Sequence, residues 1–396
     1  MRKKCIFLIV PAMYSGGQER VVSRWTTILK DIYEIKVVLF DETVMDYPLD
    51  CDYYCLDLPS KKKATLFKKM TTVLKRVSKV RKLFRKDKPY AAVSFGHGAN
   101  WVNGIACLGT CKSIVSIRGY DSLNRLKTLK GLADRFLISS AGKIICVSKV
   151  MADELAGLMP SRKDKIQVLY NAYDLNEIED LAKQQTEMDP WFAENDVIIT
   201  VGTLDPIKGY WHLIKAFSLL KLSFSNLKLL HIGPDYSGYG ETLKKLVGES
   251  GHNGDIQFLG YQENPYRYIA KSKVFVLSSI TEGFPNAMVE AMACRVPVVA
   301  ADCKTGPREI LSNDYRIKTA EDVELTDYGI LVPAMNKDEN YDPRVIEECD
   351  QKLASGIALL LDDKKMAEDY AQKSTQRAAV FSYSSCREEI IKIIES

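Results

Sequence analysis

The sequence lacks a long hydrophobic run. No apolar stretch approaches the roughly 20 residues that a membrane-spanning helix needs. Residues 1–10 consist of a basic start and a short apolar run, which is also the pattern of a signal peptide. The apolar run is short, however, and residues 11–17 look like a functional loop rather than a cleavage site. We therefore expect residues 4–10 to form the first strand of the fold. With 396 residues and a net charge of only +4, the chain is long enough for two globular domains.

Metal-binding and dinucleotide motifs are also missing. The four histidines are far apart and none of the ten cysteines forms a Cys-x-x-Cys pair, so the spacings match no zinc site. Free thiols in a reducing compartment are the expected state of these cysteines. No Gly-x-Gly-x-x-Gly fingerprint occurs, so nothing in the sequence supports dinucleotide binding.

Short runs of Val, Ile and Leu alternate with helical patterns along the whole chain. The predicted strands are residues 4–10, 35–40, 91–95, 113–117, 143–147, 166–169, 197–201, 227–232, 255–259, 273–277, 296–300 and 328–332. Continuous apolar strands are typical of parallel sheets buried on both faces, and the helical segments between them indicate an α/β protein. A polar segment at 174–196 separates two series of strands. We expect two Rossmann-like domains, at 1–185 and 186–375, followed by a helical tail.

The most informative segment is Thr281–Ala293, which follows a predicted buried strand and ends in a predicted helix. Glu282 lies in the short loop and Glu290 lies eight residues later, an offset that returns nearly to the same helical face. Backbone N–H groups at a helix N-terminus bind anions such as phosphate, whereas carboxylates accept hydrogen bonds from sugar hydroxyls. The loop that forms this predicted site is Gly283, Phe284, Pro285 and Asn286, and each of these residues except Pro285 carries a backbone N–H. Together these parts predict a nucleotide-sugar site.

This segment resembles the Glu-x7-Glu signature of retaining GT-B glycosyltransferases, in particular family 4 of the bacterial surface-polysaccharide type. The resemblance implies that Glu282 holds hydroxyls of the transferred sugar and that Glu290 holds the nucleotide ribose. It also implies two Rossmann-like domains with a cleft between them, the first for the acceptor and the second for the donor. Residues 376–396 are then expected to form a helix that crosses back to the N-terminal domain. Without the resemblance, the segment would also fit an ordinary amphipathic helix with its apolar residues packed inward.

A second motif lies at Val201–Gly209, directly after a predicted strand. It resembles the family sequence Gly-Arg-Leu followed by Lys-Gly, in which the Arg and the Lys grip the donor diphosphate. Lys208 matches this motif, but Thr203 stands where Arg is usual. A hydroxyl cannot replace the bidentate phosphate contacts of a guanidinium group. Either another Arg takes its place, or Lys208 suffices alone, or the donor binds less tightly.

In the N-terminal half, Gly16 and Gly17 begin a segment that resembles the family's Gly-Gly-x-Glu-Arg loop, which faces the donor. His97 and Arg118 each follow a predicted strand, where open α/β sheets bind ligands. Either residue could contact the acceptor or a phosphate, and either could be a structural loop residue. Asn171 matches a family position near the hinge, although a capping role fits it equally well.

The stretch 61–88 is strongly basic, and Asp87 is its one acid. Its apolar residues recur at helical spacing, which predicts one helix packed through a single face. The residues of that stripe are Leu66, Met70, Val73, Val77, Val80 and Phe84. The opposite face fits an anionic membrane surface, which attracts each nearby basic side chain by on the order of 1 kcal/mol. Nucleic acid is the rival partner, but no stacking pattern or nucleic-acid motif accompanies the charge, so we expect none.

The expected reaction is transfer of a sugar, from a UDP-sugar or a related donor, to a saccharide acceptor with retention of configuration. The acceptor is expected to be lipid-linked, in polysaccharide biosynthesis, which places the protein in the cytoplasm at the inner face of the membrane. Glu282 and Lys208 are the predicted catalytic residues. Lys208 and the loop N–H groups would stabilise the leaving diphosphate, so we expect no metal and no cofactor. The alternatives are a sugar-nucleotide epimerase of the same architecture and a non-catalytic scaffold with a degenerate site.

Overall fold

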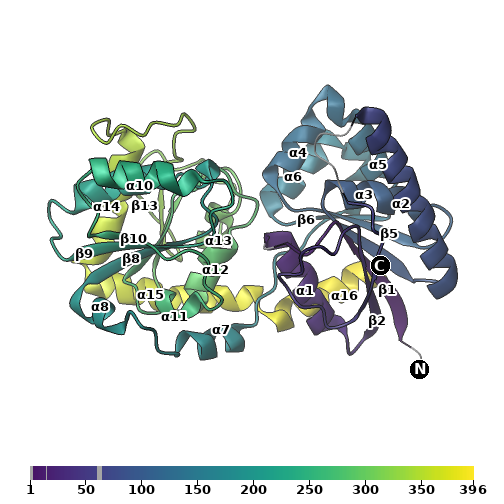
Figure 1. The fold of residues 1–396 in the computed structure, drawn as a ribbon, viewed down its shortest axis with the longest axis horizontal. Coiled ribbons are helices and arrows are strands. Elements are labelled where there is room, and N and C mark those ends of the chain that lie inside the picture. The colour runs from purple at the N-terminus through teal and green to yellow at the C-terminus, as the bar shows by residue number, and fades with distance from the viewer. Residues whose placement is uncertain (1–2, 15, 60–64) are drawn as a thin grey trace. The chain divides into compact units, whose positions relative to one another are not determined.

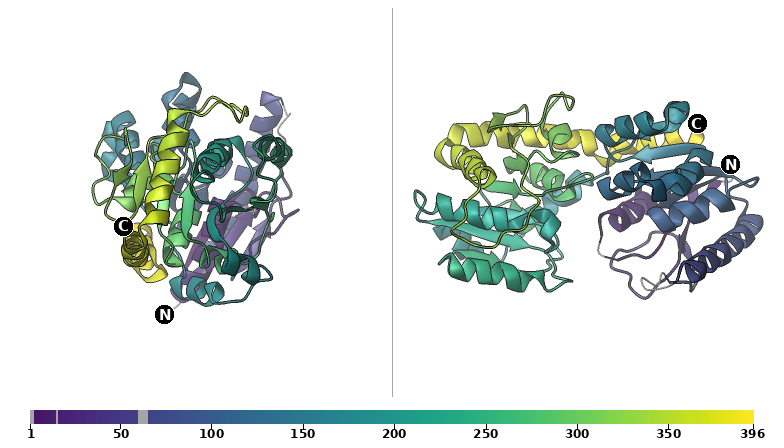
Figure 2. Two further views of the ribbon diagram at one scale, coloured as in Figure 1. Left: turned by 90° about the vertical axis from the view of Figure 1, so that its left-hand side faces the viewer. Right: turned by 90° about the horizontal axis from the view of Figure 1, so that it is seen from above.

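The structure, a computed structural model, describes residues 3–14, 16–59 and 65–396. The chain forms two compact units, of which the N-terminal unit consists of the residues up to Ala172 together with Tyr383–Ser396. The C-terminal unit is Tyr173–Ser382. The chain thus passes between the units at 172/173 and again at 382/383, whereas the sequence suggested divisions at 185/186 and 375/376. Helices cover both faces of the sheet in each unit (Figure 1 and Figure 2).

The N-terminal unit is built on a parallel sheet with the strand order β3-β2-β1-β4-β5-β6-β7. Its strands are β1 (Lys4–Val10), β2 (Tyr33–Leu39), β3 (Asp52–Cys55), β4 (Ala91–Phe95), β5 (Lys112–Ile117), β6 (Lys143–Cys146) and β7 (Ile166–Val168). Its helices are α1 (Gly17–Leu29), α2 (Leu66–Asp87), α3 (His97–Ala106), α4 (Tyr120–Lys127), α5 (Leu132–Ser140), α6 (Lys149–Leu158) and α16 (Tyr383–Glu395). The predicted loops at Gly16, His97 and Arg118 therefore follow β1, β4 and β5 at the carboxyl ends of parallel strands.

The last helix, α16, belongs to the N-terminal unit, where it lies beside α1 (Figure 1). Ile390, Ile393 and Ile394 are buried in the same apolar core as Trp25 of α1. At the end of the helix, Glu395 accepts a hydrogen bond of 2.9 Å from the Tyr33 hydroxyl and pairs with Lys4. Burial of three isoleucines contributes several kcal/mol on the area scale, so this helix is an integral part of the unit.

The C-terminal unit is built on a sheet with the order β10-β9-β8-β11-β12-β14-β13, in which β13 alone of the described strands runs antiparallel to its neighbour. The strands are β8 (Asp196–Val201), β9 (Leu227–Ile232), β10 (Ile256–Phe258), β11 (Val274–Leu277), β12 (Val298–Ala301), β13 (Glu324–Leu325) and β14 (Ile330–Val332). The helices are α7 (Leu175–Ala182), α8 (Asp189–Glu194), α9 (Tyr210–Leu220), α10 (Tyr239–Glu249), α11 (Tyr266–Ile269), α12 (Asn286–Ala293), α13 (Pro307–Leu311), α14 (Glu348–Asp362) and α15 (Lys364–Ala378). Two 3-10 turns, η3 (Pro206–Lys208) and η4 (Ala379–Phe381), matter for the site below.

The predicted α/β class is confirmed, and each predicted strand overlaps an observed one. The strands that the pattern missed, β3 and β13, lie at the ends of their sheets. β3 has the sequence DYYC and is half exposed, and β13 has only two residues. Because β3 is polar and partly exposed and β13 is so short, a search for buried apolar runs does not detect them, although it does find the other two edge strands, β7 and β10.

The predicted basic helix corresponds to α2, and the expected residues 61–64 lie outside the described residues. Val77, Val80 and Phe84 are buried as predicted. The prediction is wrong for Met70, which is 59% exposed, because only the C-terminal part of α2 packs on the unit. The side chain of Leu66 is not described.

Arg76 belongs to the basic stretch that the sequence predicted to be charged surface, but it is buried. Its guanidinium lies 4.0 Å from the Phe40 ring centre and donates to the Leu58 carbonyl.

Candidate active site

The two predicted catalytic residues are in contact. Lys208 Nζ lies 2.7 Å from Glu282 Oε1, and the Ser279 hydroxyl donates to the same oxygen over 2.7 Å. The Thr305 hydroxyl donates to the backbone carbonyl of Glu282. These bonds fix the Glu282 carboxylate through one oxygen, and Oε2 makes no hydrogen bond with the described residues. That second oxygen is free to accept a hydrogen bond from a ligand.

Lys208 is positioned by close packing between two loops. Gly209 has φ of +60°, and a Cβ at this position would lie 2.3 Å from the Ser278 carbonyl oxygen, so only glycine fits. The Ser278 hydroxyl donates to the Lys208 carbonyl over 2.9 Å. Asp205 caps the η3 turn by accepting from the Ile207 N–H over 2.9 Å. The loop after β8 is thereby held against the loop after β11, where Glu282 lies.

Burial disfavours the charged form of Lys208, but the carboxylate of Glu282 outweighs this effect and raises the pKa of the lysine. The side chains of Lys208 and Glu282 are 27% and 9% exposed. The lysine is therefore a cation at neutral pH, largely shielded from water by the surrounding loops. A partly desolvated cation interacts more strongly with a phosphate than one in bulk water does.

The helix α12 begins at the predicted loop and has no side-chain cap. The backbone N–H groups of Gly283 and Ala287 have no hydrogen-bond partner within the described parts of the chain. The loop is held from the side by Gly306, whose φ is +96° and where a Cβ would lie 2.5 Å from Pro285 Cδ. An uncapped helix N-terminus with free N–H groups and a positive dipole end is suited to an anion.

The argument from helical pitch does not apply to the two acids. Glu282 lies in the loop, whereas α12 starts at Asn286, so the eight-residue offset is not a distance along one helix. Glu290, in α12, is only 2% exposed. The structure therefore places Glu282 in the loop before α12 and Glu290 more than one turn inside that helix, so the two acids do not share one helical face.

Thr203 lies directly after β8, and its neighbour Leu204 donates from its backbone N–H to the Pro234 carbonyl over 2.9 Å. None of the hydrogen bonds or ion pairs to Lys208 and Glu282 in the described chain involves an arginine. Arg308 follows Thr305 by three residues, and its guanidinium is engaged by Asp302 and Glu324. Lys208 is thus the cation that the structure places beside Glu282 in these two loops.

The predicted N-terminal residues lie in the other unit. Gly16 is the N-cap residue of α1 and Gly17 is its first residue. His97 Nε2 lies 2.8 Å from Asp134, which also binds Trp101 and Arg125. Arg118 donates to the Ser116 hydroxyl over 3.2 Å and to the side chain of Asn171. Both His97 and Arg118 therefore have structural partners, as one of the two interpretations of each residue expected.

The sequence pattern missed several residues that support the site. Ser278 and Ser279 bind Lys208 and Glu282, Thr305 binds the Glu282 backbone, and the Tyr210 hydroxyl faces Gly202, where an added Cβ would lie 2.8 Å away. One signal was available for the serines: a polar pair directly follows the apolar run of β11. Thr305 and Tyr210 carry no such signal, because their contacts join distant segments.

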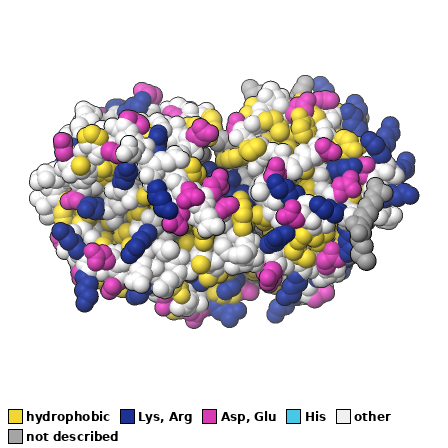
Figure 3. Space-filling model, turned by 90° about the horizontal axis from the view of Figure 1, so that it is seen from below, with side chains coloured by type: hydrophobic (Ala, Val, Ile, Leu, Met, Phe, Trp, Pro, Cys, Tyr) yellow, Lys and Arg dark blue, Asp and Glu magenta, His cyan; other side chains and the backbone are white. Residues whose placement is uncertain are grey.

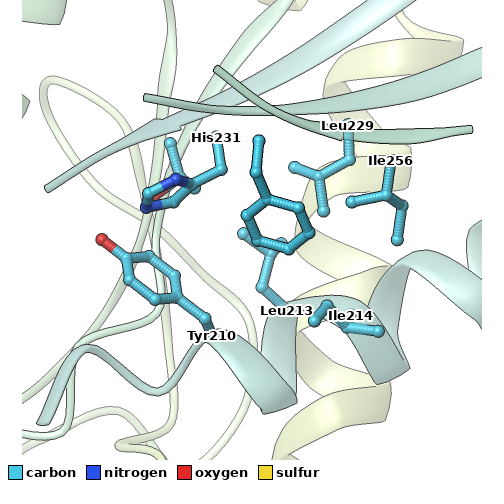
Figure 4. Close-up of a pocket in the computed structure, with 8 residues that line it drawn as sticks. Tyr210, Leu213, Ile214, Leu229, His231 and Ile256 are labelled. Atoms are coloured by element: carbon cyan, nitrogen blue, oxygen red, sulfur yellow. The ribbon is translucent and has the colours of Figure 1, made fainter. Parts of the chain in front are cut away.

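A small cavity lies behind the loop at Gly202, between the sheet and α9 (Figure 4). Its volume of about 10 Å³ is near that of one water molecule. It is lined by Thr200, Tyr210, Leu213, Ile214, Leu229, His231, Ile256 and Phe258. The Tyr210 and His231 rings meet edge to face at 4.7 Å, and neither ring nitrogen of His231 has a partner among the described residues.

We expect His231 to make the protein sensitive to acid. Burial lowers the pKa of His231 from 6.5 to about 4. Because the unfolded state takes up the proton first, the stability is complete above pH 6.5 and falls by about 3 kcal/mol as the pH drops toward 4. The variant His231→Leu should retain its melting temperature at pH 7 and lose this part of the decline. An identical decline in both proteins, measured by calorimetry between pH 7 and 4, would contradict the assignment.

Two clusters of metal-type ligands occur in the described chain, His212–Cys349–Asp350 and Glu42–Cys55–Asp57, and neither includes Lys208 or Glu282. Both ring nitrogens of His212 are already engaged, by Asp350 at 2.5 Å and by the Asn336 carbonyl at 2.9 Å. Burial opposes protonation of His212, but the bond to Asp350 outweighs it and raises its pKa to about 10. This cluster is therefore a buried ion pair that ties α9 to α14.

Two family models match the chain over most of its length. Residues 183–377 match "Glycosyl transferases group 1", and residues 15–177 match "Glycosyltransferase Family 4". A relative from Campylobacter jejuni, N-acetylgalactosamine-N,N'-diacetylbacillosaminyl-diphospho-undecaprenol 4-alpha-N-acetylgalactosaminyltransferase, is 26% identical over 403 residues, covering 100% of both chains. The capsular polysaccharide biosynthesis glycosyltransferase CapM of Staphylococcus aureus is 26% identical over 299 residues, covering 71% of this chain and 74% of the relative.

Among solved structures, Anabaena HepE in complex with UDP and glucose aligns with a TM-score of 0.78 at 20% identity, covering 99% of both chains. The fold and the matches define the class, which is that of the two-domain GT-B glycosyltransferases. The chain belongs to the glycosyltransferases of group 1 and family 4 and is a transferase enzyme. The comparisons do not favour an epimerase. None of the helices in the described ranges is both long and apolar enough to cross a bilayer.

Proposed function

We propose that this enzyme transfers a sugar from a UDP-sugar to a saccharide acceptor with retention of configuration. One observation carries the proposal: Lys208, in the loop after β8, pairs with Glu282, in the loop that leads into the uncapped N-terminus of α12. A nucleoside diphosphate sugar needs a cation and N–H donors for its phosphates and a carboxylate for its hydroxyls. All three kinds of group are present here.

Each group has one task in the proposed reaction. Negative charge grows on the departing diphosphate, and Lys208 together with the N–H groups at Gly283 and Ala287 would stabilise it. Oε2 of Glu282 would accept a hydrogen bond from the sugar, while Oε1 stays fixed by Lys208 and Ser279. The leaving phosphate would take the proton of the acceptor hydroxyl on the same face of the sugar. This scheme needs no enzymic nucleophile and no metal.

The relatives support a polysaccharide pathway. The name of the Campylobacter jejuni relative describes an acceptor linked to diphospho-undecaprenol, and the CapM relative acts in capsular polysaccharide biosynthesis. We propose a lipid-linked saccharide as the acceptor here. HepE was solved with UDP, which makes UDP the first nucleotide to test.

A thermal-shift screen tests the donor site. The protein is mixed with UDP, GDP and ADP and with their sugar derivatives, and the melting temperature is measured. At about 100 times the dissociation constant, the correct ligand adds about 2.7 kcal/mol of stability, which is several degrees. No shift with any nucleotide would contradict the proposal and favour a scaffold. Isomerisation of the donor without an acceptor would favour the epimerase.

We further propose that α2 places the enzyme on the inner face of the plasma membrane as a peripheral protein. Its first turns present Phe67, Met70 and Leu74, which are 76%, 59% and 60% exposed. Lys68 and Lys69 are exposed between them. Figure 3 shows many Lys and Arg side chains at the right-hand margin, the side where Figure 1 places α2. Exposed apolar side chains among lysines are typical of helices that lie on anionic membranes.

The double variant Lys68→Glu, Lys69→Glu should bind vesicles that contain anionic lipid at least about tenfold more weakly, because each basic side chain contributes on the order of 1 kcal/mol. Arg76 is left unchanged, since its reversal would damage the fold. The matched control is the double variant Lys244→Glu, Lys245→Glu, which reverses the charge of an exposed lysine pair on α10 in the other unit. Equal loss in both double variants, or no loss in either, in a vesicle sedimentation assay would refute a specific role for α2.

A further inference from the structure

The two points where the chain leaves and re-enters the N-terminal unit are bonded to each other. Tyr173, the first residue of the C-terminal unit, pairs with Ser382, its last residue, in a parallel β-bridge. The Tyr173 N–H donates to the Phe381 carbonyl over 2.9 Å. The two connections therefore form one short, hydrogen-bonded element.

Both connections carry an aromatic side chain onto the proposed phosphate loop. The Tyr173 side chain is fully buried, and its hydroxyl donates to Asn286 Oδ1 over 2.5 Å. Asn286 is the first residue of α12. The Phe381 ring packs edge to face on the Phe284 ring at 5.4 Å. Two of the four loop residues are thus held directly by the connections.

The residues just before Tyr173 are the last of this part of the N-terminal unit and are bonded within it. The Asn171 side chain accepts a hydrogen bond from Arg118, and the Ala172 carbonyl accepts one of 2.9 Å from Arg24 in α1. Asn171 is 4% exposed and Ala172 is 2% exposed. Three extended residues span at most about 10 Å. A segment this short, fixed on both sides, has little slack with which to absorb a movement of Asn286.

We propose that the segment Asn171–Tyr173 couples donor binding at the N-terminus of α12 to Arg118 and α1 in the N-terminal unit. This inference rests on the proposed function, because it assigns the donor diphosphate to the loop at Gly283–Asn286. Tyr173 and Asn171 are positioning residues: they touch no substrate and act through Asn286 and Arg118. A ligand that orders the loop at Gly283–Asn286 favours one conformation of the segment Asn171–Tyr173. By thermodynamic reciprocity, the conformation of this segment then also alters the affinity for the donor.

Hydrogen exchange of the full chain tests the coupling, with UDP or the nucleoside diphosphate that the thermal screen selects. In the wild type, we expect nucleotide to slow exchange at 283–290 and also at 116–123, the latter by about fivefold or more. In Tyr173→Phe, which keeps the ring and removes only the hydroxyl, protection at 283–290 should persist and the response at 116–123 should be lost. Asn171→Ala should abolish the same response, and the double variant should behave like either single variant.

The matched control is Tyr370→Phe, which removes the hydroxyl of another buried tyrosine of the C-terminal unit, bonded to the Thr326 carbonyl. This variant should respond as the wild type does. A response at 116–123 that survives in Tyr173→Phe, or that is absent from the wild type although 283–290 is protected, overturns the coupling and leaves the proposed function standing. If no nucleotide protects 283–290 or shifts the melting temperature, the proposed function itself fails.

Discussion

Replacing Glu282 by glutamine is expected to lower the rate of sugar transfer by about 100- to 1,000-fold, the usual loss when one hydrogen-bonding group that acts in the transition state is removed from an active site. Glutamine keeps the shape of the side chain, so Ser279 retains an acceptor and the fold should remain intact. The substitution removes the negative charge that faces Lys208 at 2.7 Å and weakens the acceptor offered to the sugar. The measurement is release of the nucleoside diphosphate in the presence of donor and acceptor.

Two further variants make the result specific. Glu290→Gln should act mainly on donor affinity, because the family resemblance assigns this residue to the ribose. Glu241→Gln, on the exposed surface of α10, is the matched control and should have no effect. If Glu282→Gln transfers sugar at the normal rate with its true donor, the sugar-holding role of Glu282 is wrong.

Replacing Lys208 by methionine is expected to lower kcat by about 1,000-fold, because the departing diphosphate loses its cation in a shielded site. The loss of activity should be at the upper end of the usual range, since Thr203 occupies the position of the family's arginine and Lys208 is the cation that pairs with Glu282. Lys208→Met keeps most of the side-chain volume but leaves the Glu282 carboxylate without its cation, so some loss of stability should accompany the loss of activity, and the melting temperature shows whether the variant is folded in the assay. Steady-state kinetics with saturating donor separate kcat from KM.

The variant Thr203→Arg tests the same idea in the opposite direction. A guanidinium at this position should lower the dissociation constant for the nucleotide by about tenfold, which is the effect expected of one added charge-assisted hydrogen bond. In the Lys208→Met background it should restore part of the activity. If Lys208→Met is as active as the wild type, another group neutralises the leaving phosphate.

The central strands were predictable from sequence because they are continuous apolar runs that both faces of a parallel sheet require. The segment Phe275–Leu277 illustrates this point, as all of its side chains are buried. The strands β3 and β13 were not predictable, because β3 is polar and partly exposed and β13 has only two residues. Met70 shows the same limit in a helix: periodicity identifies the apolar face of α2 but not where the neighbouring surface ends.

For the site, the sequence supplied the residue types and the structure supplied their contacts. Glu282 and Lys208 were found through a motif, but their ion pair joins residues 74 apart in the chain. The bond between Tyr173 and Asn286 spans 113 residues, and no local pattern predicts it. Contacts of this kind depend on the order of strands in the sheet. Because β8, β11 and β12 are neighbouring parallel strands, the loops that follow them lie together at the carboxyl ends of the strands.

A crystal structure of the enzyme with its nucleotide-sugar donor tests the central claim most directly. We expect the diphosphate oxygens to lie within hydrogen-bonding distance of the N–H groups of Gly283 and Ala287 and of Lys208 Nζ, with a sugar hydroxyl at Glu282 Oε2. A donor bound elsewhere, with this loop empty, would contradict the account.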